Sequence, residues 1–215
     1  MHIPDGFISP KVYLPAYGVG AALWAVGILR LGRSLRAQMV PFLSVTTAVA
    51  FVLMTILLPL PGGTSIHASG IGMIAVLFGP WVSFLCLSLV LLLQVFLLGE
   101  GGITSFPVNA LAMGLIGSLV AWAVYRLLRR WNLRLALFLA GWSAVCAAAL
   151  VVAVVLGIQP AIAHRADGTP LFFPFGLEVT LPAILVPHAL VGIAEGILTI
   201  LAYEFFGRRM HTLSR

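Results

Sequence analysis

The sequence predicts an all-α, polytopic membrane helical bundle with about seven transmembrane segments, the N-terminus outside and the C-terminus in the cytoplasm. Three observations lead to this prediction. Of the 215 residues, 61% are hydrophobic and only 8% are charged, whereas soluble domains carry about 25% charged residues. Apolar runs recur at the length of a bilayer-spanning helix. Basic residues gather in alternate connections between these runs.

Seven apolar segments follow one another along the chain. A bilayer-spanning helix needs ~20 mostly apolar residues. Six runs come close to that length, at residues of about 12–31, 40–60, 81–98, 103–128, 135–158 and 181–206. The remaining run, about 66–78, is short and lies between Pro61-Gly62-Gly63 and Gly79-Pro80. A long irregular insert at 159–180 is expected before the last segment.

The basic residues follow the positive-inside rule if all seven segments cross the membrane. The inner connections then hold Arg30, Arg33, Arg36, Arg126, Arg129, Arg130, Arg134, Arg208, Arg209 and Arg215, and only Lys11 and Arg165 lie outside. Six crossings would place the arginine clusters at 30–36 and 208–215 on opposite faces, so the pattern favours seven. The isoelectric point near 10.2 therefore indicates contact with the inner leaflet of the lipid bilayer rather than nucleic-acid binding.

The first six residues, Met1-His2-Ile3-Pro4-Asp5-Gly6, are suited to hold a divalent metal ion. The terminal amine, the His2 backbone nitrogen and the His2 imidazole can all reach one ion, closing a five-membered and a six-membered ring. The fourth corner of that plane suits another imidazole, and His67 is the candidate. Such a plane of nitrogens favours Ni²⁺ or Cu²⁺ over Zn²⁺.

The alternative for His2 is an exposed residue on a frayed terminus. This alternative is disfavoured because Pro4, with its fixed φ, and Gly6, with its free φ, are typical of a turn. In addition, Ile3 and Phe7 are too apolar for a solvated tail. We expect the segment to pack into the protein. Cys86 and Cys146 lie inside apolar runs and are interpreted as small hydrophobes, neither a disulfide nor a metal site.

Three polar residues near these histidines are candidates for a supporting role. Asp5 could accept a hydrogen bond from an imidazole N–H or from a loop amide, or form an Asx-type turn with Gly6. Thr64 and Ser65 could cap the short helix that carries His67. The sequence leaves the alternatives for Asp5 open.

Four further polar residues lie within the apolar segments. Gln94 and Asn109 are expected to form hydrogen bonds between helices, either as simple links or to position the metal loop. His188 and Glu195 are seven residues apart and share one helix face near the middle of the membrane. Ionisable groups at that depth suggest function, and a structural or supporting role is favoured over a second metal site.

The N-terminal motif Met-His-Ile-Pro-Asp-Gly, the later Gly-Thr-Ser-Ile-His stretch, and Gly101-Gly102-Ile103-Thr104 with Asn109 resemble the CbiM/NikM family. Members are the substrate-binding membrane components of energy-coupling-factor cobalt and nickel transporters. The resemblance implies that Met1, His2 and His67 hold Ni²⁺ or Co²⁺ as a transported substrate, with no catalytic cofactor. The Pro-Asp in the motif is more similar to the nickel branch.

The resemblance also implies partners and a location. The partners would be a scaffold transmembrane subunit and ATPase subunits, with or without a small accessory membrane subunit. The location would be the prokaryotic plasma (inner) membrane, with the metal site on the extracytoplasmic face. We expect one membrane-embedded domain over residues 1–215, consisting of an N-terminal metal-binding segment (1–11), an additional N-terminal helix (12–32) and core helices (40–206).

The sequence contains no P-loop, so the energy for transport is expected to come from a partner ATPase, and the chain is not expected to be an enzyme. The alternative is a self-sufficient secondary metal-ion carrier, for which Glu195 is the only good candidate for a proton-coupling carboxylate. A metal-dependent intramembrane hydrolase is disfavoured, because neither a His-Glu-x-x-His motif nor a Ser-Lys or Asp dyad is present.

Overall fold

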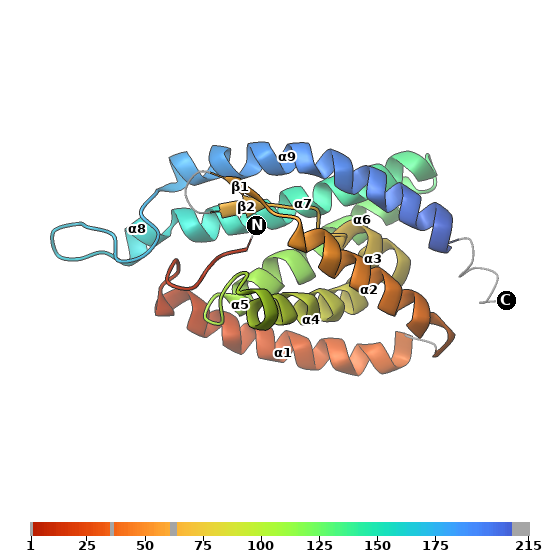
Figure 1. The fold of residues 1–215 in the computed structure, drawn as a ribbon, viewed down its shortest axis with the longest axis horizontal. Helices are drawn as coiled ribbons and strands as arrows, with labels where there is room; N and C mark the ends of the chain where they lie inside the picture. Colours follow the sequence, from red (N-terminus) through yellow and green to blue (C-terminus); the bar gives the residue numbers. More distant parts are fainter. Residues whose placement is uncertain (1, 35–36, 61–63, 208–215) are drawn as a thin grey trace.

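The computed structural model describes residues 2–34, 37–60 and 64–207, which form a bundle of helices (Figure 1). The elements in chain order are α1 (Pro10–Ser34), η1 (Ala37–Met39), α2 (Val40–Thr55), β1 (Leu58–Leu60), β2 (Thr64–Ile66), α3 (Ile71–Phe78), α4 (Pro80–Leu98), α5 (Phe106–Asn109), η2 (Ala110–Gly117), α6 (Ser118–Leu128), α7 (Leu133–Gly157), α8 (Gln159–Ile162), α9 (Leu177–Ala202) and η3 (Tyr203–Gly207). The prediction of an all-α polytopic bundle is confirmed, apart from the three-residue strands β1 and β2.

Six helical stretches of the described chain are long and apolar enough to cross a membrane. They are Pro10–Gly32, Ala37–Thr55, Pro80–Leu98, Phe106–Leu128, Leu133–Ile162 and Leu177–Gly207. The seventh predicted segment contains only the eight-residue α3, which at 1.5 Å per residue spans about 12 Å. Figure 1 shows that β2, the following extended residues and α3 together run in the direction opposite to α2 and α4. Between α2 and α4 the chain therefore reverses direction through non-helical backbone and a short helix, whereas the sequence predicts a seventh membrane-spanning segment there.

The second helix ends earlier than the sequence predicts. The apolar run was expected to be helical to residue 60, but α2 ends at Thr55 and the chain continues as β1, which pairs antiparallel with β2. Pro59 explains the difference, because a proline in a helix clashes with the carbonyl four residues earlier, which here belongs to Thr55. Leu58, directly before the proline, is also driven towards extended backbone.

The expected insert at 159–180 is shorter than predicted and partly ordered. It begins with the one-turn helix α8 and contains an isolated antiparallel bridge between His164 and Pro170. α9 begins at Leu177, three residues after Pro174. The insert is shorter because residues 177–180 add one turn to the N-terminal end of α9. Glu178 stabilises this turn, because a negative charge is favoured near the positive end of the helix dipole.

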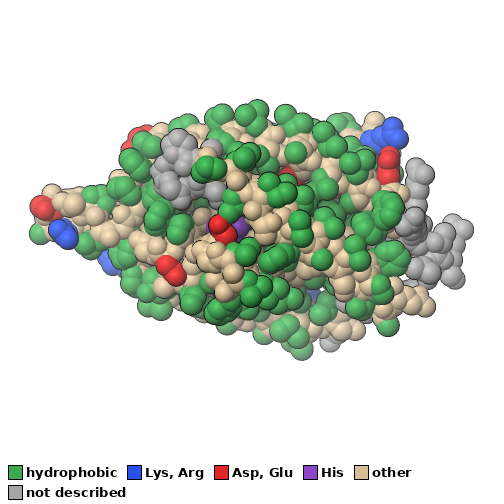
Figure 2. Space-filling model, viewed as in Figure 1, with side chains coloured by type: hydrophobic (Ala, Val, Ile, Leu, Met, Phe, Trp, Pro, Cys, Tyr) green, Lys and Arg blue, Asp and Glu red, His purple; other side chains and the backbone are tan. Residues whose placement is uncertain are grey.

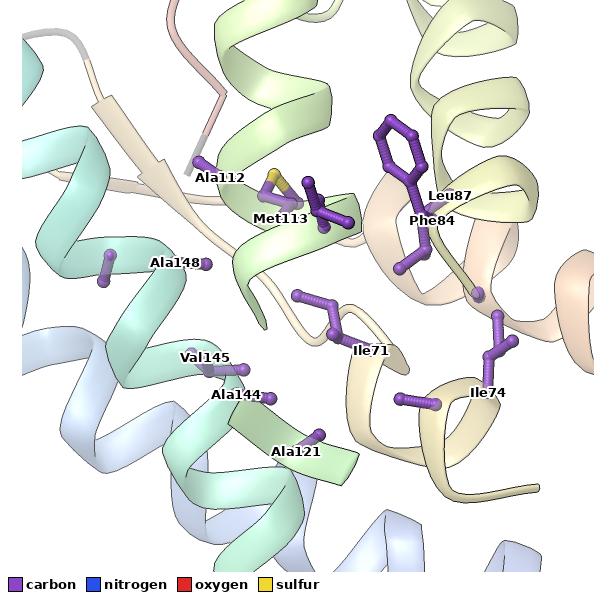
Figure 3. Close-up of a cluster of buried hydrophobic side chains, with 14 of the residues drawn as sticks. Ile71, Ile74, Phe84, Leu87, Ala112, Met113, Ala121, Ala144, Val145 and Ala148 are labelled. Atoms are coloured by element: carbon purple, nitrogen blue, oxygen red, sulfur yellow. The ribbon is translucent and has the colours of Figure 1, made fainter. Parts of the chain in front are cut away.

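The short helix α3 lies inside the bundle. Figure 3 shows Ile71 and Ile74 of α3 among buried side chains of α4, η2, α6 and α7, many of them alanines. A Cβ atom added at Gly72 would lie 2.5 Å from the Gly141 Cα of α7, so the two backbones are in direct contact. This packing fixes α3, and with it the chain that leads into α3 from His67.

The two ends of the bundle differ in charge. The chain enters α1 and α9 at one end, where Asp5, Glu100, Asp167 and Glu178 lie, and leaves α1, α6 and α9 at the other, where Arg30, Arg126, Arg129, Arg130 and Arg134 lie. Between the ends, hydrophobic side chains are spread along the visible face in Figure 2. We call the second end the basic end. Arg33 and Arg36 have no described side chain, and Arg208, Arg209 and Arg215 lie outside the described residues.

Candidate metal site

The N-terminal segment, residues 2–9, enters the bundle rather than extending into solvent. Ile3 and Ile8 are fully buried, and the chain turns at Gly6, whose φ of 82° favours glycine. The expectation that an apolar terminus would pack into the protein is therefore met. His2, next to Ile3, is carried with it and is only 4% exposed.

Hydrogen bonds from distant parts of the chain hold this segment at every second residue. Asn109 binds both sides of Ile3, accepting from its N–H at 3.0 Å and donating to its carbonyl at 3.1 Å, and Ser105 donates to the same carbonyl. Phe173 N–H donates to the Phe7 carbonyl at 3.2 Å. These bonds hold the segment on both sides of its turn at Gly6.

Ser9 completes this series, because its N–H donates to Gln159 Oε1 at 2.9 Å. Ser105, Gln159 and Phe173 were not among the candidates named from the sequence. Each lies more than 100 positions from its partner in the chain, and no local pattern marks it. The one available signal was the polarity of Gln159 at the end of an apolar run.

His2 and His67 lie together although they are 65 positions apart. Their rings are stacked, with centroids 4.7 Å apart and planes inclined by 19°, and His67 is only 2% exposed. With metal–nitrogen bonds of about 2 Å, two imidazoles at adjacent corners of a square plane have centroids roughly 4–5 Å apart. The observed separation therefore suits two imidazoles that share one ion at adjacent corners.

The ring nitrogens of this pair are available for a metal. The His67 Nδ1 lies 3.1 Å from the Ala68 carbonyl, so Nδ1 carries the proton and donates, leaving the lone pair on Nε2. Among the described residues, no hydrogen-bond partner reaches His67 Nε2 or either ring nitrogen of His2. Buried polar atoms without partners are rare in proteins, and three of them lie on these two neighbouring rings.

Burial also keeps His2 unprotonated. The pKa of His2 is lowered to about 3, chiefly because its charged form is penalised away from water. An imidazole must be neutral to bind a metal ion. At neutral pH the His2 ring is therefore ready to bind without first losing a proton.

The polar residues predicted to support the metal site lie in different parts of the structure. Gln94 is fully buried beside the His2 ring, and its amide nitrogen and oxygen have no partner within the described chain. Asn109 holds the Ile3 backbone, as above, and is the last residue of α5, directly before the π-helical segment η2, a type of irregularity found at functional sites. Met1 lies outside the described residues, as do the side chains of Thr64 and Ser65.

Asp5 binds a loop rather than a histidine. Its carboxylate accepts from the backbone N–H groups of Ile103 at 3.0 Å and Thr104 at 2.8 Å, and from the Thr104 hydroxyl. Partial burial raises the pKa of Asp5, but the bonds from Thr104 and Ile103 outweigh it and leave the pKa below its usual value. Of the alternatives left open by the sequence, the structure shows the loop amide.

Gly102 allows this contact, because the Asp5 segment lies directly against it. A Cβ added at Gly102 would lie 2.2 Å from Asp5 Oδ1 and 2.5 Å from the Asp5 backbone nitrogen. No L side chain fits there without moving the N-terminal segment.

We therefore expect Gly102→Ala to weaken metal binding about 10–100-fold, the range typical of disturbed supporting groups, while the bundle stays folded. Gly18→Ala is the matched control, since a Cβ at Gly18 meets nothing within 4 Å. Calorimetric titration with Ni²⁺ and a thermal melt of each variant are the measurements. Equal affinity of the two variants would contradict the role of this contact.

Glu195 of α9 holds the chain just after His67. Its Oε1 accepts from the Ser69 hydroxyl and the Gly70 N–H, each at 2.9 Å, and from the Ser69 N–H. The Glu195 side chain is fully buried. His188, on the same helix, is bound by its Nδ1 to the Ile184 carbonyl at 2.7 Å. No group of three or more His, Cys, Asp or Glu side chains placed to hold a metal ion occurs in the described chain.

We expect Glu195→Ala to weaken Ni²⁺ binding about tenfold, because the 67–70 segment loses its anchor, whereas Glu195→Gln keeps an acceptor oxygen and most of the affinity. A double-mutant cycle separates this effect from general destabilisation. In a His67→Ala background, Glu195→Ala should cause no further loss. A tenfold loss in that background as well would show that Glu195 does not act through His67.

The sequence matches the model of a known protein family over residues 2–213, described as the cobalt uptake substrate-specific transmembrane region (CbiM). The chain is 41% identical over 212 residues to a probable fused nickel transport protein, LarMN, of Lactiplantibacillus plantarum, covering 97% of this chain and 65% of that protein. It is 34% identical to a putative cobalt transport protein, CbiM 1, of Methanosarcina barkeri, covering 92% and 83%.

A similar structure has also been solved. The crystal structure of a truncated transition metal transporter superposes with a TM-score of 0.92 at 35% identity, covering 97% of this chain and 99% of that one. The chain spans less than two thirds of the length of the fused nickel transport proteins that it matches.

Proposed function

The chain belongs to the CbiM family of cobalt-uptake substrate-specific transmembrane regions, and from its buried histidine pair we propose that it binds a divalent transition-metal ion for uptake, with Ni²⁺ favoured and Co²⁺ next. The observation that carries the proposal is the buried pair of His2 and His67, whose ring centroids lie 4.7 Å apart. Three of the four ring nitrogens of this pair lack a hydrogen-bond partner among the described residues. Relatives of this chain are named as nickel and cobalt transport proteins, which supports a transporter rather than an enzyme.

Four nitrogens are proposed to form the site. They are the Met1 amine, the His2 backbone nitrogen, the His2 Nδ1 and the His67 Nε2. The paired bonds between Asn109 and Ile3 fix the backbone directly after His2, so the chelating atoms are held before the ion arrives. Preorganisation of this kind raises affinity because less ordering remains to be done on binding.

A planar set of four nitrogens favours ions with tetragonal geometry, which is the physical basis for preferring Ni²⁺. The choice also follows the names of relatives, since two that are 41% identical are called nickel transport proteins. Co²⁺ accepts the same donors less strongly in the usual order of divalent metal affinities. We therefore expect both ions to bind, Ni²⁺ more tightly.

Transport is proposed to depend on partners. The chain would work with a scaffold transmembrane subunit and ATPase subunits of an energy-coupling-factor transporter in the prokaryotic inner membrane, with or without a small accessory membrane subunit. The histidine pair would then face the extracytoplasmic side, since the basic end of the bundle is favoured on the cytoplasmic side. A self-sufficient secondary carrier is the competing hypothesis.

Two measurements test the proposal. Purified protein with an unmodified N-terminus is titrated with Ni²⁺ and Co²⁺, and its visible spectrum is recorded. A yellow, diamagnetic Ni²⁺ complex is expected for a square plane, and a paramagnetic complex would contradict the four-nitrogen site. Uptake is then measured in cells that express the chain alone or with candidate scaffold and ATPase subunits. Equal uptake by the chain alone would support the secondary carrier.

A further inference from the structure

The basic end of the bundle carries arginine side chains stacked on aromatic rings. The guanidinium carbon lies 4.5 Å from the ring centroid in the pair Arg30–Trp81, 4.6 Å in Arg126–Trp122 and 5.6 Å in Arg129–Tyr125. Stacking uses the face of a guanidinium, so the N–H groups in its plane can still bind an oxyanion with two parallel hydrogen bonds. The first pair joins α1 to α4, and the other two lie on the last turns of α6 and at the residue that follows it.

Residues of these pairs line two adjoining hollows. One, of about 470 Å³, is lined by Tyr125, Arg126 and Arg129 together with residues of α3 and η3. The other, of about 320 Å³, is lined by Arg30 and Trp81. Both are also lined by Phe78, Gly79 and Trp122, so they meet at the turn between α3 and α4. Volumes of this size match those of small-molecule sites.

The charge around the hollows favours an anion. The sequence has six acidic residues, all within the described part of the chain, and none lines either hollow. Glu204 is the acidic residue near this end, and it binds Arg134 at 3.1 Å. Positive charge in the hollows is therefore not matched by a carboxylate that lines them.

The surroundings of the hollows identify the anion as part of a lipid. Ile28 and Leu29 beside Arg30 are 61% and 72% exposed, and Leu127 beside Arg126 is 73% exposed. In a membrane these side chains face acyl chains, while Trp81 and Trp122 suit the level of the head groups. We propose that the two hollows bind the phosphate of an anionic phospholipid, whose acyl chains lie along α1 and α6. Basic pockets between transmembrane helices are a known means of binding lipid head groups.

The test compares lipids on the full-length protein. Delipidated protein is titrated with phosphatidylglycerol or with zwitterionic phosphatidylcholine, and bound lipid is counted by native mass spectrometry. We expect phosphatidylglycerol to bind preferentially, and the doubly substituted Arg126→Gln/Arg129→Gln protein to lose about fivefold in that preference per arginine. Equal binding of the two lipids by the unsubstituted protein would overturn the proposal.

Two variants separate a built site from general positive charge. Arg126→Lys/Arg129→Lys keeps the net charge but loses the planar stacked donors, so the preference should fall at least fivefold. Arg130→Gln removes one charge at the same end from an exposed residue that lines neither hollow, so the preference should be unchanged. A lysine variant that behaves like the unsubstituted protein would show that only charge matters and would refute the site.

A soluble phosphate compound would offer the hollows the same phosphate group as a phospholipid. Millimolar glycerol phosphate should compete weakly with phosphatidylglycerol, because it lacks the acyl chains. If it binds as tightly as the lipid, the site is for a soluble phosphate and the lipid assignment is wrong. Ni²⁺ titration of the same variants should give the affinity of the unsubstituted protein, because the histidine pair lies in the other half of the bundle, so this test is independent of the proposed metal site.

Discussion

Replacing His2 by alanine is expected to lower Ni²⁺ affinity by more than about 100-fold, the upper end of the range for a supporting group. The substitution removes an imidazole and breaks the six-membered chelate ring that it closes with its own backbone nitrogen. His67→Ala removes one corner of the plane and leaves the three nitrogens of residues 1 and 2, so its loss should be smaller. His188→Ala should have the smallest effect, because the Met1 amine, the two His2 nitrogens and the His67 Nε2 already fill the four corners of the proposed plane.

Calorimetric titration of these three variants in detergent checks the expected order, His2→Ala, then His67→Ala, then His188→Ala. Each variant is first melted to show that it is folded, since all three side chains are buried. The visible spectrum of the Ni²⁺ complex adds a second readout, because water in place of the His67 nitrogen shifts the absorption of the ion. If His188→Ala lost the metal while His67→Ala kept it, the site would lie deeper in the bundle than the histidine pair.

Adding a residue in front of Met1 is expected to abolish high-affinity Ni²⁺ binding. The extension turns the terminal amine into an amide, and it displaces the five-membered ring that the amine closes with the His2 nitrogen. The buried position of His2 and Ile3 makes the effect larger, because an added residue has to enter the space where the metal is proposed to lie.

The matched control is the same extension followed by a protease site that restores Met1 as the first residue. Cleavage should recover full affinity, measured by titration before and after the protease. A tag after Arg215 should be harmless in the seven-pass topology, where ~30 Å of hydrocarbon separates that end from the histidine pair. Full affinity in the uncleaved protein would rule out the amine as a ligand.

The sequence by itself determined the helices and the candidate ligands. Hydropathy locates the long helices because the transfer of each side chain into lipid depends mainly on that residue. Gly79-Pro80 marks the break between α3 and α4, where the structure has it. His2 and His67 could be named because a histidine at position two closes chelate rings through the local backbone, without any distant contact.

The tertiary structure decided which partners these groups have. Asp5 had three possible acceptor roles, and only the position of the 102–104 loop selects the backbone N–H groups of Ile103 and Thr104. Glu195 could have served proton coupling or support, and the packing of α3 places the Ser69 and Gly70 amides on its Oε1. Contacts between residues about 100 or more positions apart depend on how helices cross.

The seventh predicted segment and the basic end show the same difference between what local sequence predicts and what tertiary contacts decide. Hydropathy predicts a membrane-spanning segment at 66–78, but the structure has there only the eight-residue α3, buried among small residues, preceded by a strand pair that follows the end of α2 before Pro59. Charge alone places the arginines at one end. The four-residue spacing of Trp122–Arg126 and Tyr125–Arg129 is visible in the sequence. Only the folded chain brings Arg30 of α1 onto Trp81 of α4, because that pair joins two different helices.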